Sequence, residues 1–185
     1  MSFREKTIKK MLPKAYLRKY VAHEIYVALT FFKNLVPVMD RYVYNDGTTK
    51  DLMSLTGTIP VMISDANYNI PICIWFEESY PQDAPICYVK PTSEMVVVTG
   101  TYVSNNGEIL LPYLQDWKNG ECDLVSLLQV MVAVFGESPP VAKRPYPEHE
   151  QASCWLQCRE ADENSYLSLT REDGQSFQQQ NESNC

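Results

Sequence analysis

The sequence has little of what membrane-spanning, secreted or metal-binding proteins need. Its 185 residues contain no run of about 18 apolar residues, so we expect no transmembrane helix. Residues 1–6 have no apolar core of the kind that a secretory signal needs. We therefore expect a cytoplasmic protein whose six cysteines stay reduced.

Metal ligands are also scarce and unfavourably spaced. The chain has two histidines, His23 and His149, and its cysteines at positions 73, 87, 122, 154, 158 and 185 form no C-x-x-C pair. A structural zinc site needs a full set of such ligands at close spacing. We predict no metal site and no cofactor.

Acidic side chains are concentrated towards the C-terminus. Residues 1–145 hold 14 basic and 15 acidic side chains, whereas the last forty hold 2 basic and 8 acidic ones. From Tyr146 the composition shifts to Gln, Glu, Ser and Asn. We predict one folded domain over residues 1–145 and a disordered acidic tail over residues 146–185. Nothing in this distribution indicates a nucleic-acid-binding surface.

Period-two alternation predicts an antiparallel β-meander between Pro37 and Lys90. Odd positions from Met53 to Ile63 are mostly apolar, and even positions carry the apolar side chains from Ile70 to Phe76. Turns are expected at 45–48, which contains the Asp-Gly pair of many hairpins, and at 64–67. A fourth short strand is expected at 86–90. On this pattern Trp75 lies on the wet face, opposite the buried isoleucines.

Helices are expected on both sides of the meander in the sequence. Two N-terminal segments, 3–12 and 21–35, are helix candidates, and the basic residues around them form either a solvated face, the favoured interpretation, or a contact with an acidic membrane. Apolar spacing from Leu124 to Phe135 predicts an amphipathic helix with Asp123 as N-cap and Gly136 as the C′ residue. We expect this helix to cover the isoleucine face of the sheet. Between Pro91 and Tyr113 we expect an ordered loop with one short strand at 96–98.

Five stretches of the sequence resemble a known family. They are Val43-Tyr44-Asn45-Asp46-Gly47, Leu55-Thr56-Gly57-Thr58-Ile59-Pro60-Val61, Tyr68-Asn69-Ile70-Pro71-Ile72, Pro85-Ile86-Cys87-Tyr88-Val89-Lys90-Pro91-Thr92 and Leu111-Pro112-Tyr113-Leu114. Together they resemble the ubiquitin-conjugating-enzyme variant (UEV) domain of the tumour-susceptibility family, subunits of the endosomal sorting complex ESCRT-I. The resemblance covers about residues 5–145 and implies an α/β (α+β) ubiquitin-conjugating-enzyme-like fold.

The resemblance also implies that the chain is not an enzyme. Active conjugating enzymes carry a cysteine nucleophile shortly after a His-Pro-Asn triplet, and this chain has Leu110 at that place and Tyr102-Val103-Ser104 as the triplet. An aliphatic side chain cannot attack a thioester. Cys122 is the best substitute because it starts the last helix, but Glu121 and Asp123 disfavour a thiolate there. Cys73 and Cys87 lie in strands and are expected to be packing residues.

Two binding surfaces are implied by the matching positions. The ubiquitin-binding positions are Val43, Asn45, Asp46, Trp75 and Tyr88, where the family has Phe in place of Tyr88. Positions for Pro-Thr/Ser-Ala-Pro peptides are Thr58, Ile63, Tyr68, Asn69, Ile70, Pro71, Thr92, Met95, Pro139 and Val141. The family has Tyr in place of Ile63 and Phe in place of Ala142, so we expect a weakened or retuned peptide groove.

The resulting prediction is a non-catalytic adaptor in the sorting of ubiquitinated cargo. Its expected partners are ubiquitin and, secondarily, Pro-rich peptides, and its expected location is the cytoplasm with peripheral association to endosomes. Two alternatives remain: a non-catalytic partner subunit of an active conjugating enzyme, or a shortened competitor of the full-length ESCRT-I subunit, because no coiled coil is found in the sequence.

Overall fold

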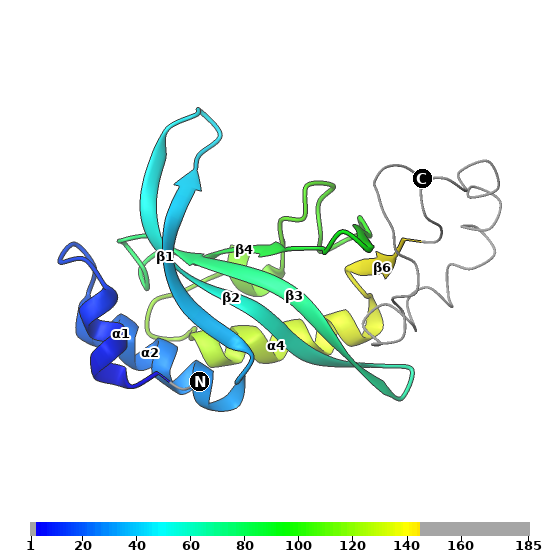
Figure 1. The fold of residues 1–185 in the computed structure, drawn as a ribbon, viewed down its shortest axis with the longest axis horizontal. Helices are drawn as coiled ribbons and strands as arrows, with labels where there is room; N and C mark the ends of the chain where they lie inside the picture. The colour runs from blue at the N-terminus through cyan, green and yellow to red at the C-terminus, as the bar shows by residue number, and fades with distance from the viewer. Residues whose placement is uncertain (1–2, 145–185) are drawn as a thin grey trace.

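A computed structural model describes residues 3–144 of the chain. The predicted tail at 146–185, with the role of its cysteines, lies outside these residues. The elements in order are α1 (Glu5–Met11), α2 (Arg18–Phe31), β1 (Leu35–Val43), β2 (Thr49–Ile63), β3 (Ala66–Phe76), β4 (Ile86–Val89), β5 (Met95–Val97), α3 (Pro112–Gln115), α4 (Leu124–Glu137) and β6 (Val141–Lys143). Figure 1 shows the helices gathered on one side of a twisted sheet. The predicted α+β architecture is confirmed.

The main sheet is an antiparallel meander in the order β1-β2-β3-β4. The apolar residues predicted for one face, on β2 from Met53 to Ile63 and on β3 from Ile70 to Phe76, are buried in one core together with Tyr68. The β2–β3 turn contains two residues, Ser64 and Asp65, both with positive φ, and Ile63 pairs with Ala66. This is the backbone geometry that matches the twist of a two-residue hairpin.

The opposite face of β3 is not wet, contrary to the sequence prediction. Cys73 is 5% and Trp75 9% exposed, and they form a second small cluster with Leu52. Partly buried Tyr42, Ile86 and Tyr88 pack against this cluster. The second face is covered because the β1–β2 hairpin brings Tyr42 over the ring of Trp75.

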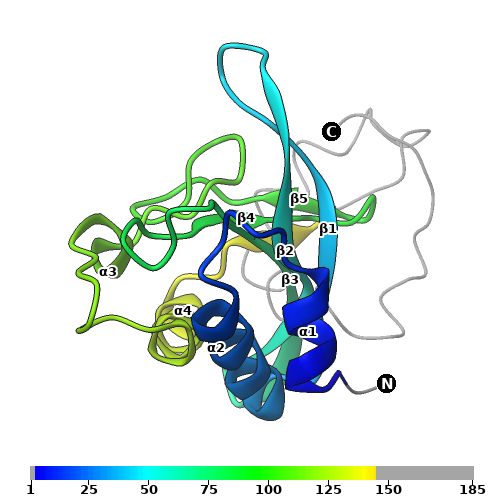
Figure 2. The same cartoon turned by 90° about the vertical axis from the view of Figure 1, so that its left-hand side faces the viewer.

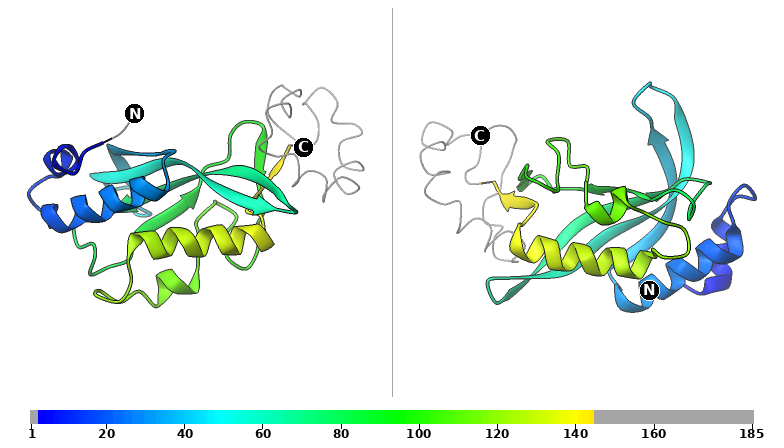
Figure 3. Two further views of the ribbon diagram at one scale, coloured as in Figure 1. Left: turned by 90° about the horizontal axis from the view of Figure 1, so that it is seen from below. Right: turned by 180° about the vertical axis from the view of Figure 1, so that it is seen from behind.

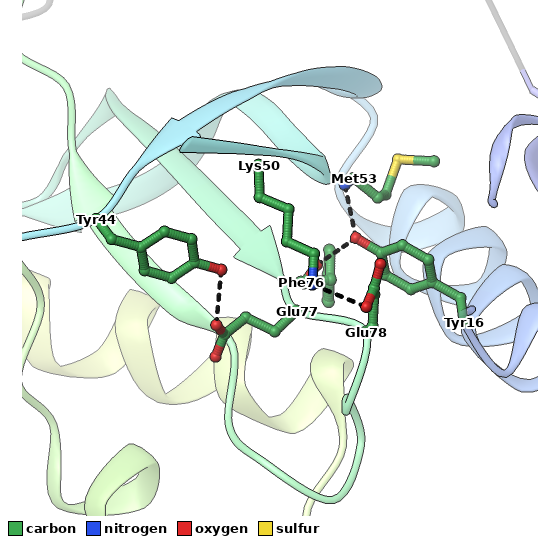
Figure 4. Close-up of polar contacts among 7 residues, drawn as sticks. All are labelled: Tyr16, Tyr44, Lys50, Met53, Phe76, Glu77 and Glu78. Carbon is green, nitrogen blue, oxygen red and sulfur yellow. Dashed lines mark hydrogen bonds and ion pairs between the residues drawn. The ribbon is translucent and has the colours of Figure 1, made fainter. Parts of the chain in front are cut away.

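The β1–β2 hairpin extends beyond the end of β3. The side chain of Tyr16 lies in the fork, the point at Met53 and Phe76 where β2 and β3 separate. Met53 is the β2 residue paired with Phe76, the last residue of β3. The Tyr16 hydroxyl accepts a hydrogen bond from the Met53 N–H (3.0 Å) and donates one to the Phe76 carbonyl (2.6 Å), as Figure 4 shows. A side-chain hydroxyl therefore bridges the last pair of the β2–β3 ladder, and beyond it the hairpin projects alone.

Three helices form the layer on the other side of the core. Figure 3 shows α4 running along the sheet, where it packs on β2, while α2 packs on α4 and α1 packs on α2. Asp123 caps α4 as predicted, since its Oδ1 accepts from the Ser126 N–H at 2.8 Å. Glu24 of α2 accepts from the Leu124 N–H at the same helix end (3.1 Å). Among residues 3–144, no helix combines the length and apolar character needed to cross a membrane.

The prediction that Gly136 follows the last helix is wrong, because α4 continues to Glu137 and its C-cap is Ser138. A Cβ on Gly136 would lie 2.9 Å from the carbonyl oxygen of Met62. The glycine thus allows the close approach of α4 to β2, and the proline pair that follows ends the helix.

Two features of the segment after β4 differ from the predicted loop. The expected short strand exists as β5, but it pairs with β6, which the sequence pattern did not indicate. Residues 112–115, expected to be irregular, form the short helix α3 (Figure 2). The β5–β6 pair forms a separate two-stranded sheet beside the main one.

Gly57 tests the close approach of β2 to the backbone at Asn34, just before β1. It lies in β2 with φ +143, and a Cβ there would lie 2.0 Å from the carbonyl oxygen of Asn34. Because the obstacle is backbone, we expect Gly57→Ala to lower the free energy of unfolding by more than about 2 kcal/mol. Denaturant unfolding measures this. Gly100→Ala is the matched control, since nothing lies within 4 Å of its added Cβ; equal effects of the two changes would contradict the packing described.

Candidate functional site

The tip of the β1–β2 hairpin is a tight turn with defined internal hydrogen bonds. The Tyr44 N–H donates to Thr48 O (2.8 Å) and the Gly47 N–H to Tyr44 O (2.9 Å), with Gly47 at φ +90. The Asp46 carboxylate accepts from the Thr48 N–H (3.0 Å) and hydroxyl (2.7 Å), and these bonds lower the pKa of Asp46. The turn expected from the Asp-Gly pair is confirmed, and its shape is held by its own side chains.

A hollow of about 410 Å³ lies beside this hairpin. Three of the five residues assigned to ubiquitin binding line it: Val43, Trp75 and Tyr88. The other two, Asn45 and Asp46, are exposed at the hairpin turn. Lining residues that the sequence did not point to are Arg41, Tyr42, Val89, Lys90, Pro91, Val97, Asn105 and Asn106. Val43 is strongly exposed, at 60%, whereas Trp75 and Val89 are buried.

Packed aromatic rings form the floor of the hollow. Tyr42 lies edge-on to Trp75 (ring centroids 5.1 Å apart) and to Tyr44 (4.9 Å). Its hydroxyl is 3.3 Å from that of Tyr88. Trp75 is therefore part of this floor and is held by neighbouring rings; it is not the solvent-exposed side chain that strand alternation predicted. Burial, together with the Tyr88 hydroxyl, raises the pKa of Tyr42, which keeps that phenol protonated.

Two polar contacts tie the hairpin to the segment that follows β3. The Tyr44 hydroxyl donates to Glu77 Oε2 at 2.9 Å, and the Lys50 ammonium donates to Glu78 Oε1 at 2.9 Å (Figure 4). Burial and the Glu77 carboxylate raise the pKa of Tyr44 to about 12. No local pattern in the sequence predicts these two pairs, because the partners are 33 and 28 residues apart and meet only when the hairpin folds over the end of β3.

The loop that carries Leu110, at the position expected for the nucleophile of active enzymes, runs along β4. The Ile109 N–H donates to Cys87 O and the Val89 N–H to Gly107 O, both at 2.8 Å. Leu110 follows, 38% exposed, with its N–H bonded to Tyr102 O at 2.7 Å. The backbone places an aliphatic side chain at the surface next to the β4 edge.

The described cysteines are positioned mainly for packing. Cys73 and Cys87 are buried, as predicted, and burial raises the pKa of both thiols. Cys122 is half-buried at the start of α4, where its sulfur accepts from the Lys118 N–H at 3.4 Å. No group of three or more His, Cys, Asp and Glu side chains is arranged to bind a metal within residues 3–144.

The residues assigned to the peptide groove fall on two parts of the fold. Those on β2 and β3 are Thr58, Ile63, Tyr68, Asn69, Ile70 and Pro71, and those around the β5–β6 pair are Thr92, Met95, Pro139 and Val141. Ile63, Tyr68 and Val141 are buried in the same core cluster, Tyr68 with 2% of its surface exposed. Asn69 and Thr92 are exposed. The ring expected to stack on a proline is thus packed inside the molecule in this structure.

Comparison with known sequences identifies relatives over most of the chain. A family model described as the UEV domain matches residues 7–143. The human "Tumor susceptibility gene 101 protein" is 48% identical over 154 residues, which cover 81% of this chain and 40% of the human protein. "Ubiquitin-conjugating enzyme E2 variant 3" of Xenopus tropicalis is 34% identical over 141 residues, 76% of this chain and 30% of the frog protein. The chain thus spans less than half the length of these curated relatives.

Two solved structures share the fold. One is the yeast vps23 UEV domain in complex with a vps27 PSDP peptide, with a TM-score of 0.61 and 23% identity; it covers 75% of this chain and 97% of that one. The other is a complex of the Vps23 UEV with ubiquitin, with a TM-score of 0.60 and 24% identity; it covers 74% of this chain and 94% of that one.

The sequence match over residues 7–143 and the shared fold lead to one assignment. This chain belongs to the UEV family, whose domains are non-catalytic variants of ubiquitin-conjugating enzymes.

Proposed function

We propose that this chain is a non-catalytic adaptor that binds ubiquitin, in the sorting of ubiquitinated cargo at endosomes. One observation carries the proposal: Val43, Trp75 and Tyr88, far apart in sequence, line one hollow at the base of a projecting hairpin. The Vps23 UEV, which has the same fold, has been solved in complex with ubiquitin. The "ESCRT-I complex subunit tsg101" of Dictyostelium discoideum, 31% identical over 87 residues, supports a role in the same sorting complex.

The hollow has the physical character of a protein-binding surface. An exposed valine stands beside largely buried aromatic rings, and the hollow also has exposed polar lining residues: Arg41, Lys90, Asn105 and Asn106. Apolar anchors surrounded by polar groups are typical of the energetic centre of an interface. The rings are already packed against one another, so little conformational entropy is lost when a partner covers them.

Leu110 supports the assignment of a binding role without transfer chemistry. By the family resemblance we place Leu110 at the position of the nucleophile of active conjugating enzymes, and its side chain has no group that can form a thioester. Cys73 and Cys87, which flank this region in β3 and β4, are buried with raised pKa values and are poor substitutes. The ubiquitin surface is therefore proposed to bind and hold its partner only.

Val43→Ser tests the ubiquitin surface. Burial of a valine at an interface contributes roughly 1.5–3 kcal/mol, so we expect ubiquitin affinity to fall about tenfold or more. Isothermal titration with ubiquitin measures the loss. Met62→Ser is the matched control, since Met62 is a similarly exposed apolar residue (54%) near the opposite end of β2. Equal affinity of Val43→Ser and the unchanged protein would refute this site.

The Tyr44–Glu77 contact is proposed to hold the hairpin in its binding position. Because the folded-state pKa of Tyr44 is raised from 10.0 to about 12, its stabilising contribution is present below about pH 10 and is lost as the pH rises through 12. We expect Tyr44→Phe to lower the unfolding free energy by about 1 kcal/mol at neutral pH. In denaturant titrations the difference from the unchanged protein should shrink above pH 10. A difference that stays constant with pH would exclude this role of the hydroxyl.

A second proposed ligand is a Pro-Thr/Ser-Ala-Pro peptide, because the Vps23 UEV of the same fold was solved with a PSDP peptide. The exposed Asn69 on β3 and Thr92 before β5 offer polar contacts to an extended chain. Ile63 and Tyr68 are buried, so a bound proline has to displace what covers them. Ile63 and Ala142 stand where the family has aromatic rings, which favours weak binding.

Ile63→Tyr tests the peptide proposal. Restoring a ring beside Tyr68 should raise the affinity for a Pro-Thr-Ala-Pro peptide about ten- to a hundredfold, since an aromatic contact adds roughly 0.5–1.5 kcal/mol to the gain in buried area. Fluorescence anisotropy with a labelled peptide measures this, and a scrambled peptide is the control. Identical affinities of the two proteins would show that Ile63 does not weaken the groove.

A further inference from the structure

Charge is strongly separated within the described domain. Residues 1–35, which contain α1 and α2, hold eight Lys and Arg and two Glu, a net charge of +6. Residues 36–144 hold six Lys and Arg and thirteen Asp and Glu, a net charge of -7. The net charge of residues 1–144 is only -1, but the N-terminal helices are basic and the rest of the domain is acidic. Such a charge distribution orients a protein in the field of an anionic partner.

The solvent-facing side of the same helical layer carries large apolar side chains. Phe31 is 62% exposed, Leu17 61%, Tyr26 40% and Tyr20 39%. The buried residues of α2 are Val21, Ala22, Ile25 and Ala28. Leu17, Tyr20 and Phe31 lie on one flank of this buried set, and Tyr26 lies on the other flank, where it lines a separate hollow with Phe3 and Lys33. A solvated basic face does not need such side chains. Basic residues interleaved with Leu, Phe and Tyr are typical of helices that lie in a membrane interface.

Part of this surface forms a hollow of about 760 Å³ at the α1–α2 junction. Leu17, Arg18, Lys19, Tyr20 and His23 line it together with Glu5, Tyr16, Pro81 and Asn119. Exposed Lys14 lies on the short connection just before these residues. Glu5, the acidic member, is 3.3 Å from the His23 ring and 41% exposed. Apolar and cationic groups therefore meet at one place on the surface.

We propose that the outer face of α1 and α2, centred on Leu17 and the basic residues around it, docks on the surface of an anionic lipid bilayer. The lysines and arginines attract the negative lipid headgroups, while Leu17, Tyr20 and Phe31 enter the boundary between headgroups and acyl chains. A single-stranded nucleic acid would use the same charges, but it offers no apolar phase for an exposed leucine and phenylalanine. The combination favours the membrane.

The docked orientation leaves the ubiquitin surface accessible. In Figures 1 and 2 the tip of the β1–β2 hairpin points away from α1 and α2. The hollow near Val43 and the hollow near Leu17 share no lining residue. The membrane proposal thus does not depend on the ubiquitin proposal, and the two can be tested separately.

Vesicle co-sedimentation with the 185-residue chain tests this inference. We expect binding to vesicles of equal parts phosphatidylcholine and phosphatidylserine, weakened by salt, and no binding to phosphatidylcholine alone. Lys14→Gln with Lys19→Gln should reduce binding about thirtyfold, because each basic residue near the surface contributes about fivefold. Gln115→Glu with Gln129→Glu changes the net charge equally at exposed positions of α3 and α4 and should change binding less than about twofold.

Leu17→Ser separates membrane insertion from folding. Leu17 is the N-cap of α2 and makes no side-chain capping bond, whereas serine is a favourable N-cap. We expect the thermal stability of this variant to be equal or higher and its vesicle affinity to fall about tenfold. Equal binding to both vesicle types, full binding by the Lys14 and Lys19 variant, or binding to a single-stranded RNA without binding to vesicles would each overturn the proposal.

Discussion

The bridge that Tyr16 makes between β2 and β3 determines the shape of this protein. Its hydroxyl accepts a hydrogen bond from the Met53 N–H and donates one to the Phe76 carbonyl, so both buried backbone groups are satisfied where the two strands separate. Leaving such groups without partners costs roughly 1–3 kcal/mol each. Burial raises the pKa of Tyr16, which keeps the phenol in the protonated form that the bridge requires. A hairpin can therefore leave the sheet at this point without exposing an unpaired end of β3.

The projecting hairpin in turn creates the candidate site. Tyr42 covers Trp75, Tyr44 reaches Glu77 and Lys50 reaches Glu78, so three contacts along the hairpin fix its direction relative to β3. Val43 and the turn that follows it are thereby held above a floor of packed rings. On the other side of β4 the loop ends in Leu110, and the thiols of β3 and β4 are buried. The proposed binding role rests on this surface, and Leu110 and the buried thiols are the residues on which the proposed loss of transfer chemistry rests.

Much of the fold could be predicted because its signals are local. The buried isoleucine face of β2 and β3, the Asp-Gly turn and the Asp123 cap each depend on a few neighbouring residues, and each is confirmed, whereas the predicted wet face of β3 is wrong. The errors concern contacts between distant segments. Trp75 is covered because Tyr42 of the hairpin packs on its ring. The strands β5 and β6 have three residues each, too few to show a period-two pattern. Gly136 lies within the helix because a Cβ there would meet the carbonyl oxygen of Met62. The candidate site residues came from a family resemblance, and the contacts that Tyr42, Tyr44 and Glu77 make beside them depend on the folded hairpin.

The central claim is that the bridge at the fork holds the hairpin in place for binding. Tyr16→Phe removes one oxygen and keeps the ring, so amide hydrogen exchange of this variant, followed by titration with ubiquitin, tests the claim most directly. We predict faster exchange at Met53 and along the hairpin, unchanged exchange in α4, and weaker binding of ubiquitin. Hairpin protection and ubiquitin affinity equal to those of the unchanged protein would contradict the account.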